Sequence, residues 1–331
     1  MSAVPVLRLG LVGAGAIAQT HVQALAGCAE VRLVAVTDTR FEAARTLANQ
    51  AGCLAFADLN TMLASVELDA ALVCIPPAAH ADVVCQFLAA GLHVLCEKPW
   101  AVNLVEARRM LAAAREWGRV LTMASKFRFV ADVIRARAVI GSGLLGPIVL
   151  YENVFTASLD MRNRWNSDRQ ISGGGVLIDN GPHAADLMRY LLGPVAEVIA
   201  SVAPQVQGLD VEETVQMLAR NATGVLARVE LSWSMVQPVD YFVRVHGRDG
   251  TLSIGWKGSS YRLFAGGDAV SLGSGYDKVA AFRAQLVNFA RAIAGVEPLH
   301  VTVDDALASV AVVDAAYDSI VQRRWTSVGV E

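Results

Sequence analysis

The sequence predicts a two-domain α/β protein, with a doubly wound parallel sheet in residues 1–125 and a large open, mostly antiparallel sheet in residues 126–331. Three observations predict this fold. The chain has 331 residues, which is more than a single hydrophobic core usually supports. Short apolar runs alternate with Ala-rich helical stretches as far as Ser125. Longer alternating runs with Gly-rich turns follow, and this second pattern is typical of antiparallel strands.

Six apolar runs in the first part are predicted strands of a parallel sheet, because helical stretches separate them and such a sheet is covered on both faces. The strands are Leu7–Val12, Val31–Thr37, Cys53–Phe56, Ala70–Ile75, His93–Cys96 and Val120–Ser125. Helices are predicted at Ala16–Ala26, Glu42–Gln50, Ala81–Ala90 and Leu104–Trp117. A glycine stands just after each helix, where a left-handed conformation is least strained for glycine.

The second part begins with a predicted helix at Asp132–Ile140. Alternating apolar and polar residues then predict strands that are half-buried, with hairpin-like turns between them. These strands are Ile148–Phe155, Glu197–Val202, Glu213–Leu218, Gly224–Trp233 and Tyr241–His246. Two closing helices are predicted at Lys278–Ala294 and Asp304–Arg323. The domain boundary is this change of pattern near residue 125, since no low-complexity linker is present.

Composition excludes several classes of function. The net charge is −3 and the 28 lysines and arginines are dispersed, so no electrostatic surface for nucleic acid is expected. The apolar stretches are far shorter than the roughly 20 residues of a membrane-spanning helix. The first residues lack a basic leader and an apolar signal core, which predicts a cytoplasmic protein. The five cysteines form no C-x-x-C motif, which predicts buried, reduced thiols and no metal site.

A glycine-rich turn joins the first predicted strand to the first helix. Its sequence is Gly13-Ala14-Gly15-Ala16-Ile17-Ala18. Gly13 permits the tight turn, Gly15 lets the backbone approach a pyrophosphate, and Ala18 allows close packing of the helix on the strand. The free N–H groups of the helix start favour phosphates. The turn therefore predicts a dinucleotide site.

An acidic residue at the end of the second strand indicates which dinucleotide is bound. Asp38 lies 23 residues after Gly15, where a carboxylate accepts hydrogen bonds from the adenosine ribose and repels a 2′-phosphate. NAD is therefore predicted over NADP. Arg40 is close enough to stack on adenine or to pair with a phosphate, so NADP remains the less favoured alternative.

Two further motifs stand at the ends of the fourth and fifth strands, where ligands bind in open α/β sheets. The first is Ile75-Pro76-Pro77-Ala78-Ala79-His80 and the second is Glu97-Lys98-Pro99. A partly desolvated Lys98 could share a proton with a substrate hydroxyl. Taken alone, Glu-Lys-Pro is more often a surface turn.

A glycine triplet precedes the strongest motif of the second part, Asp179-Asn180-Gly181-Pro182-His183. Pro182 suits the first turn of a helix that runs to Leu192, since proline is favoured there. Asp179 can then orient or stabilise the His183 imidazole. Histidine suits removal of an alcohol proton near neutral pH, although a histidine at a helix start often has no chemical role.

Together these motifs resemble the glucose-fructose oxidoreductase, inositol dehydrogenase and rhizopine-catabolism (Gfo/Idh/MocA) family. The resemblance extends to the late Val245–Leu252 strand and turn and to the closing helix that starts at Asp304. It implies a Rossmann domain that binds NAD through Gly13, Asp38 and the motifs above, followed by an α/β domain. It also implies that Lys98 lies beside the nicotinamide and the substrate, with Asp179 and His183 completing a proton-transfer trio in which His183 or Lys98 is the base.

The resemblance also indicates candidate substrate-binding residues. A basic residue after the sixth strand commonly reaches the substrate in this family, and Lys126 or Arg128 would do so here, although Lys126 replaces the usual arginine. Arg164, Trp165 and Asn166 are further candidates, because a sugar-like ligand needs hydrogen-bond donors and a flat apolar surface. The alternative for this segment is a solvated loop. The open sheet of the family often forms an oligomer face, which implies a homodimer or homotetramer.

The predicted function is hydride transfer between a carbinol of a sugar, inositol or related polyol and nicotinamide. Three alternatives remain at this point. One is an NADPH-dependent reductase of a modified or nucleotide-linked sugar or of an imine, and another is a non-catalytic regulator that senses dinucleotide. The third is an NAD-assisted glycosidase. The substrate, its reacting carbon and the physiological direction do not follow from the sequence.

Overall fold

The computed structural model describes residues 5–329, which form two compact units. Neither unit is continuous in the sequence. The first contains the residues up to Ala101 together with Val105–Lys126 and Lys278–Ala306. The second contains Val102–Leu104, Phe127–Asp277 and the residues from Leu307 onward. Residues 1–4, where the sequence predicts neither a basic leader nor a signal core, lie outside the described part of the chain.

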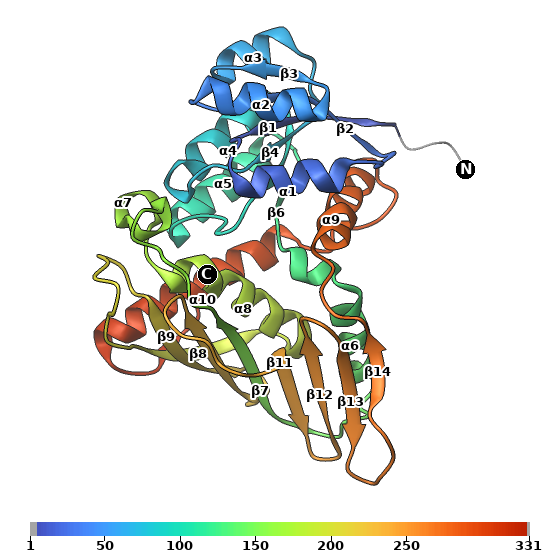
Figure 1. Cartoon of the computed structure of the whole chain (residues 1–331), viewed down its shortest axis with the longest axis vertical. Coiled ribbons are helices and arrows are strands. Elements are labelled where there is room, and N and C mark those ends of the chain that lie inside the picture. Colours follow the sequence, from blue (N-terminus) through green and yellow to red (C-terminus); the bar gives the residue numbers. More distant parts are fainter. Residues whose placement is uncertain (1–4, 330–331) are drawn as a thin grey trace. The chain divides into compact units, whose positions relative to one another are not determined.

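The first unit is built on six parallel strands in the order β3-β2-β1-β4-β5-β6 (Figure 1). This order and direction confirm the predicted doubly wound sheet, in which ligands bind at the carboxyl ends of the central strands. The strands are β1 (Leu7–Val12), β2 (Val31–Thr37), β3 (Leu54–Phe56), β4 (Ala70–Val73), β5 (His93–Cys96) and β6 (Leu121–Met123). The helices are α1 (Ala16–Leu25), α2 (Phe41–Ala51), α3 (Leu59–Ser65), α4 (His80–Ala89), α5 (Leu104–Glu116) and α9 (Lys278–Ile293).

Helix α9 belongs to this unit although the sequence placed it in the second domain. Phe282, Leu286 and Phe289 of α9 are each 1% exposed and lie in one hydrophobic core with residues of β1, β2, α1 and α2. Burial of each such side chain contributes about 1.5 to 3 kcal/mol. Arg283 adds hydrogen bonds to the carbonyl oxygens of Ala24 and Ala26 at the end of α1. Helix α9 therefore belongs to the first unit, and not to the predicted second domain, because its apolar face covers α1.

The second unit is built on nine strands in the order β14-β13-β12-β11-β7-β10-β9-β8-β15. Neighbouring strands are antiparallel except for the parallel pair of β7 and β10, so the sheet is mixed and mostly antiparallel. The strands are β7 (Ile148–Thr156), β8 (Val195–Val202), β9 (Thr214–Asn221), β10 (Leu226–Ser232), β11 (Tyr241–Gly247), β12 (Gly250–Gly255), β13 (Ser259–Leu263), β14 (Val270–Gly273) and β15 (Thr326–Ser327).

Among the described residues, four helices accompany this sheet, and one of them, α8, carries the candidate catalytic residues of the second unit. They are α6 (Ala131–Gly141), α7 (Arg169–Ser172), α8 (Val176–Leu192) and α10 (Val303–Gln322). Helix α8 contacts the central strands β7, β9 and β10, while α6 contacts β12 and β14 (Figure 1). None of the helices in the described part of the chain is both long and apolar enough to cross a membrane.

The prediction for the start of α8 was wrong. The helix begins at Val176, and Pro182 lies inside it rather than in its first turn. Proline is costly inside a helix because it has no N–H to donate. Here the surrounding residues Leu177, Gly181 and Ala184 are buried, so tertiary packing stabilises the helix around the proline. The local sequence signal, which was Pro182, placed the start of the helix too late.

Candidate active site

The glycine turn of the first unit leaves room for a ligand. Gly13 has a φ of +91°, and a Cβ built on it would lie 2.3 Å from the carbonyl oxygen of Cys74, so only glycine fits. A Cβ built on Gly15 meets no other described atom within 4 Å. The tight turn is therefore enforced by the neighbouring strand, whereas the space beside Gly15 is open.

The start of α1 can bind phosphate. Gly15 is its N-cap residue, no side chain of the described residues caps it, and its first turn carries no acidic residue. The first N–H groups of a helix without a cap need external acceptors, and the helix dipole favours an anion there. Ala14 and Ala18 are buried and Ile17 packs on the core beneath the helix, while Ala16 is exposed. These residues fit a pyrophosphate bound against the backbone.

Asp38 lies beside this turn with its carboxylate largely fixed. Its Oδ2 accepts a hydrogen bond from the backbone N–H of Ala14 at 2.7 Å, and its Oδ1 accepts one from the N–H of Arg40 at 2.8 Å. A carboxylate has about four acceptor positions, so both oxygens can still accept from a ribose diol. The Arg40 side chain is 73% exposed and its Nε lies 3.6 Å from Asp38 Oδ1.

The motif after β4 is tied to the motif after β5 by His80. This side chain is fully buried, its Nε2 lies 2.8 Å from the carbonyl oxygen of Ile75, and its Nδ1 lies 2.9 Å from that of Pro99. Burial lowers the pKa of His80, although the hydrogen bonds to the two carbonyls oppose the shift. Both ring nitrogens are engaged by the chain, which fits a residue that joins two loops better than a direct cofactor contact. Ile75 and Pro76 remain half-buried at the strand end, and Pro77 is buried.

Glu97 also turns into the protein, while Lys98 remains half-buried at its end of the sheet. One Glu97 oxygen, Oε1, lies 2.7 Å from Nε2 of His21. The other, Oε2, accepts a hydrogen bond from the backbone N–H of Lys98 at 3.1 Å. Glu97 therefore supports the turn that carries Lys98, and is itself 5% exposed.

The second unit contains Asp179 and His183, four residues apart in α8. Residues at this spacing lie on the same side of a helix. Asp179 is in the first turn, where a negative charge is favoured by the helix dipole. His183 is 5% exposed. The helix therefore places the predicted acid and imidazole on the same side.

The glycine triplet before α8 makes room for a buried carboxylate. A Cβ on Gly175 would lie 2.0 Å from the Glu212 carbonyl oxygen, and one on Gly174 would lie 2.0 Å from the Tyr317 hydroxyl. Oε1 of Glu212 accepts hydrogen bonds from the N–H groups of Gly175 and Leu177 and from the Tyr317 hydroxyl. Burial and the adjacent Glu212 hold the Tyr317 pKa far above its ordinary value. The start of α8 is thus capped by the protein itself.

A cluster of aromatic rings packs against one side of His183. The Phe127 ring meets the His183 ring edge-on, with centroids 5.0 Å apart. Phe127 also lies within 5.4 Å of Phe155, Phe242 and Tyr276 and 6.2 Å from Trp256. Trp256 is 43% exposed whereas Phe127 and Phe242 are buried. The cluster therefore offers one open aromatic surface.

The basic residues after β6 have different surroundings. Lys126 is half-buried, and its ammonium lies 5.8 Å from the centroid of the Phe282 ring. Arg128 is buried and forms an ion pair with Asp186 of α8 at 2.6 Å. An arginine engaged in this way holds α8 in place, which fits a positioning role better than the substrate contact predicted for it.

The candidate specificity loop is exposed. Trp165 is 44% exposed and starts a single helical turn, and Arg164 next to it is also exposed, while Asn166 is half-buried. The loop is held by Met161, whose N–H donates to Gln207, and by Asp168, which caps α7. Trp165 is not packed beneath the loop, so its ring is available to a ligand.

Residues 7–125 match the model of an oxidoreductase family with an NAD-binding Rossmann fold, and residues 133–253 match the GFO/IDH/MocA C-terminal domain. The chain belongs to the Gfo/Idh/MocA family. The rhizopine catabolism protein MocA of Rhizobium meliloti is 32% identical over 93% of this chain and 93% of its own length. Inositol 2-dehydrogenase of Rhizobium meliloti strain 1021 is 28% identical over 97% of this chain and 99% of its own length.

Solved structures agree with the fold of this Gfo/Idh/MocA protein. A levoglucosan dehydrogenase in complex with NADH and levoglucosan superposes with a TM-score of 0.90, at 21% identity, over 98% of this chain and 100% of that chain. The predicted family and its two-domain α/β fold are therefore confirmed, and the protein is an oxidoreductase with an NAD-binding Rossmann fold.

Several residues of this Gfo/Idh/MocA protein were not found from its sequence. Glu212, Asp186 and His21 contact the motif residues from distant positions in the chain, and no local spacing connects them. Phe127 and Phe242 look like ordinary core residues in a strand or turn. The only available signal was the glycine triplet, because three adjacent glycines indicate close approach of other atoms.

Proposed function

We propose that this protein is an NAD-dependent dehydrogenase that oxidises one carbinol of a sugar, inositol or related polyol. The observation that carries the proposal is the placement of Asp179 and a buried His183 on one side of α8, four residues apart and next to an aromatic surface. The names of the relatives, which include an inositol dehydrogenase, support the substrate class.

In the proposed reaction, side chains of the protein accept the proton of the substrate hydroxyl. NAD, when bound, accepts the hydride at nicotinamide C4. Loss of hydride from a secondary alcohol requires loss of the hydroxyl proton, and Lys98 or His183 takes it. Asp179 orients His183 and balances the charge that forms on the imidazole.

We propose NAD rather than NADP as the working cofactor because of Asp38. Its carboxylate is held beside the glycine turn by the N–H groups of Ala14 and Arg40, so a 2′-phosphate would place like charges together. Arg40 is free to move toward an adenine ring, since its side chain is largely exposed.

The proposed substrate contacts combine donors with flat rings. Lys126 and Arg164 supply charged donors, Asn166 supplies an amide, and Trp165 supplies an exposed ring for the apolar face of a sugar. Trp256 is added here because it is the exposed member of the aromatic cluster around His183. Arg128 acts through Asp186 and α8.

The test is NADH formation by the purified protein with a panel of inositols, aldoses and sugar acids, repeated with NADP. We expect absorbance at the NADH band with at least one polyol, and a higher kcat/KM with NAD than with NADP. His300→Asn is a suitable control, because His300 is exposed and lies outside the motifs. Tight NAD binding with no turnover of any compound would favour the regulatory alternative. Release of a sugar without net NADH would favour the glycosidase.

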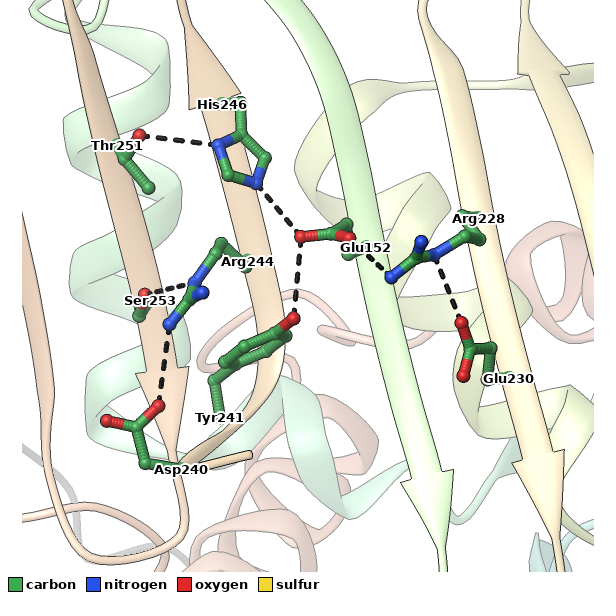
Figure 2. Close-up of polar contacts among 9 residues, drawn as sticks. All are labelled: Glu152, Arg228, Glu230, Asp240, Tyr241, Arg244, His246, Thr251 and Ser253. Atoms are coloured by element: carbon green, nitrogen blue, oxygen red, sulfur yellow. Dashed lines mark hydrogen bonds and ion pairs between the residues drawn. The ribbon is translucent and has the colours of Figure 1, made fainter. Parts of the chain in front are cut away.

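We further propose that two copies associate through the face of the nine-stranded sheet turned away from α6 and α8 (Figure 2). On this face Glu152 Oε2 lies 2.9 Å from His246 Nε2, and its Oε1 lies 2.7 Å from Arg228 Nη2. Arg228 also pairs with Glu230. Each of these carboxylates thus has a partner within the sheet, which lowers the cost of covering it. Leu150 and Leu226 pair directly on the same face.

Leu150→Glu should therefore convert a dimer or tetramer into a monomer, because it places an unpaired charge among these residues. Light scattering behind a sizing column measures the molar mass. Val105→Glu, at an exposed position of α5, should leave the mass unchanged. A monomeric wild type, or a Leu150→Glu variant that still assembles, would contradict the proposed interface.

We propose that the protein is cytoplasmic. The five cysteines are free thiols, which is usual in a reducing compartment.

A further inference from the structure

His21 is a buried histidine with a specific partner that its sequence position does not indicate. It lies on α1, is fully buried, and its Nε2 is 2.7 Å from Oε1 of Glu97, 76 positions further along the chain. Since Glu97 as a carboxylate can only accept, the proton of this contact is on His21 Nε2. Its Nδ1 has no hydrogen-bond partner among the described residues. The imidazole therefore makes one directed polar contact.

Glu97 connects His21 to Lys98, because it has a hydrogen bond with each of them. Its second oxygen accepts the Lys98 backbone N–H, and its own N–H donates to the Val73 carbonyl oxygen at 2.9 Å. Burial alone would raise the pKa of Glu97, but the hydrogen bond and charge of His21, with the charges of Lys98 and Lys126, bring it below the ordinary value. Glu97 thus has fixed partners on both oxygens, and one of those partners is the residue that carries the reactive amine.

The position of the His21 ring is also fixed. Phe282 of α9 meets it edge-on, with centroids 4.6 Å apart. His21 lies in the second turn of the same helix whose first turn faces the open space beside Gly15. A helix moves largely as a rigid element, so any shift of α1 on phosphate binding would reach Glu97 through this ring.

We propose that His21 is a positioning residue, which holds Glu97 so that the Lys98 amine is fixed and which connects the phosphate-binding helix to that amine. The proposal rests on the proposed function, in which Lys98 contacts the substrate hydroxyl. Its competitor is a purely structural role, in which His21 only fills space against Phe282.

Two substitutions separate these roles. His21→Gln keeps an N–H donor at nearly the place of Nε2 but loses the ring. His21→Phe keeps a ring against Phe282 but has no donor. Positioning requires that the glutamine variant works and the phenylalanine variant fails, whereas space filling requires the reverse.

The full-length variants are compared by kcat, by the KM for the polyol and by the dissociation constant for NADH from fluorescence titration. We expect His21→Phe to lower kcat by about 30-fold to 100-fold, since small misplacements of catalytic groups have such effects, with little change in NADH binding. His21→Gln should restore most of the kcat. A His21→Phe variant with wild-type kcat, or a glutamine variant as impaired as the phenylalanine one, would overturn the proposal.

A second readout does not depend on turnover. Trace labelling with acetic anhydride, followed by mass spectrometry of the Lys98 peptide, measures the reactivity of that amine with and without NAD. We expect His21→Phe, and not His21→Gln, to alter the Lys98 labelling rate and to abolish its response to NAD. Equal labelling of all three proteins would reject the positioning role. If labelling changes as expected while Lys98→Ala keeps full activity, His21 positions Lys98 and the proposed function fails.

Discussion

Lys98→Ala should lower kcat by about a thousandfold, because the loss of a positioned acid or base costs roughly 10²-fold to 10⁴-fold. Lys98 is half-buried at the carboxyl end of β5, and its backbone N–H is held by Glu97. The substitution removes the amine without removing that hydrogen bond. Steady-state kinetics with the best polyol and saturating NAD measure the effect.

The matched comparison is Arg45→Ala, which removes an exposed cation from α2 of the same unit. This variant should keep the wild-type kcat, and both variants should bind NADH with similar dissociation constants. A Lys98→Ala enzyme that retains more than about a tenth of the kcat would exclude Lys98 from proton transfer.

Gly175→Ala should lower the free energy of unfolding by about 3 kcal/mol, which is the upper end of the usual cost of overpacking. The added Cβ would lie 2.0 Å from the carbonyl oxygen of Glu212, which is backbone and cannot rotate away. The start of α8 and the Glu212 carboxylate that caps it would have to separate. Urea titration followed by circular dichroism measures the change.

Gly141→Ala provides the control for this change. Gly141 ends α6, and a Cβ there meets no described atom within 4 Å. Alanine in a helix is favoured over glycine by roughly 0.5 to 1 kcal/mol, so this variant should be as stable as the wild type or slightly more stable. A Gly175→Ala protein that matches it would show that the glycine triplet has no packing role.

The parallel sheet was predictable because its strands are short, mostly apolar and separated by helices. Leu7–Val12, Val31–Thr37 and His93–Cys96 have the predicted bounds. Helix α3 was missed, although Asp58 caps it by accepting a hydrogen bond from Thr61 N–H. The strands β12, β13 and β14 were also missed. They are rich in glycine and serine, and their pairing with β11 rather than their own composition makes them strands.

The residues of the candidate site also fall into those that the sequence could predict and those that it could not. Motif residues such as Gly13, Asp38 and His183 could be named because local spacing reflects local geometry. Their supports could not, since Arg128 with Asp186 and His21 with Glu97 are joined only by the folded chain. His80 shows the limit of a motif, because the spacing identified it as important while the structure assigns both of its ring nitrogens to carbonyl groups.

Helix α9 packs in the first unit although it follows most of the second unit in the sequence. This order limits how the domains of this protein can be exchanged with those of another. A gene segment for residues 1–126 would encode a nucleotide-binding domain without the helix that covers α1, leaving a bare strip where Phe282, Leu286 and Phe289 pack. A chimaera with new substrate specificity must therefore keep Lys278–Ala306 from the cofactor-binding parent. Recombination in this chain would have to replace the coding sequence for residues 127–277 and the coding sequence from residue 307 onward as two separate pieces.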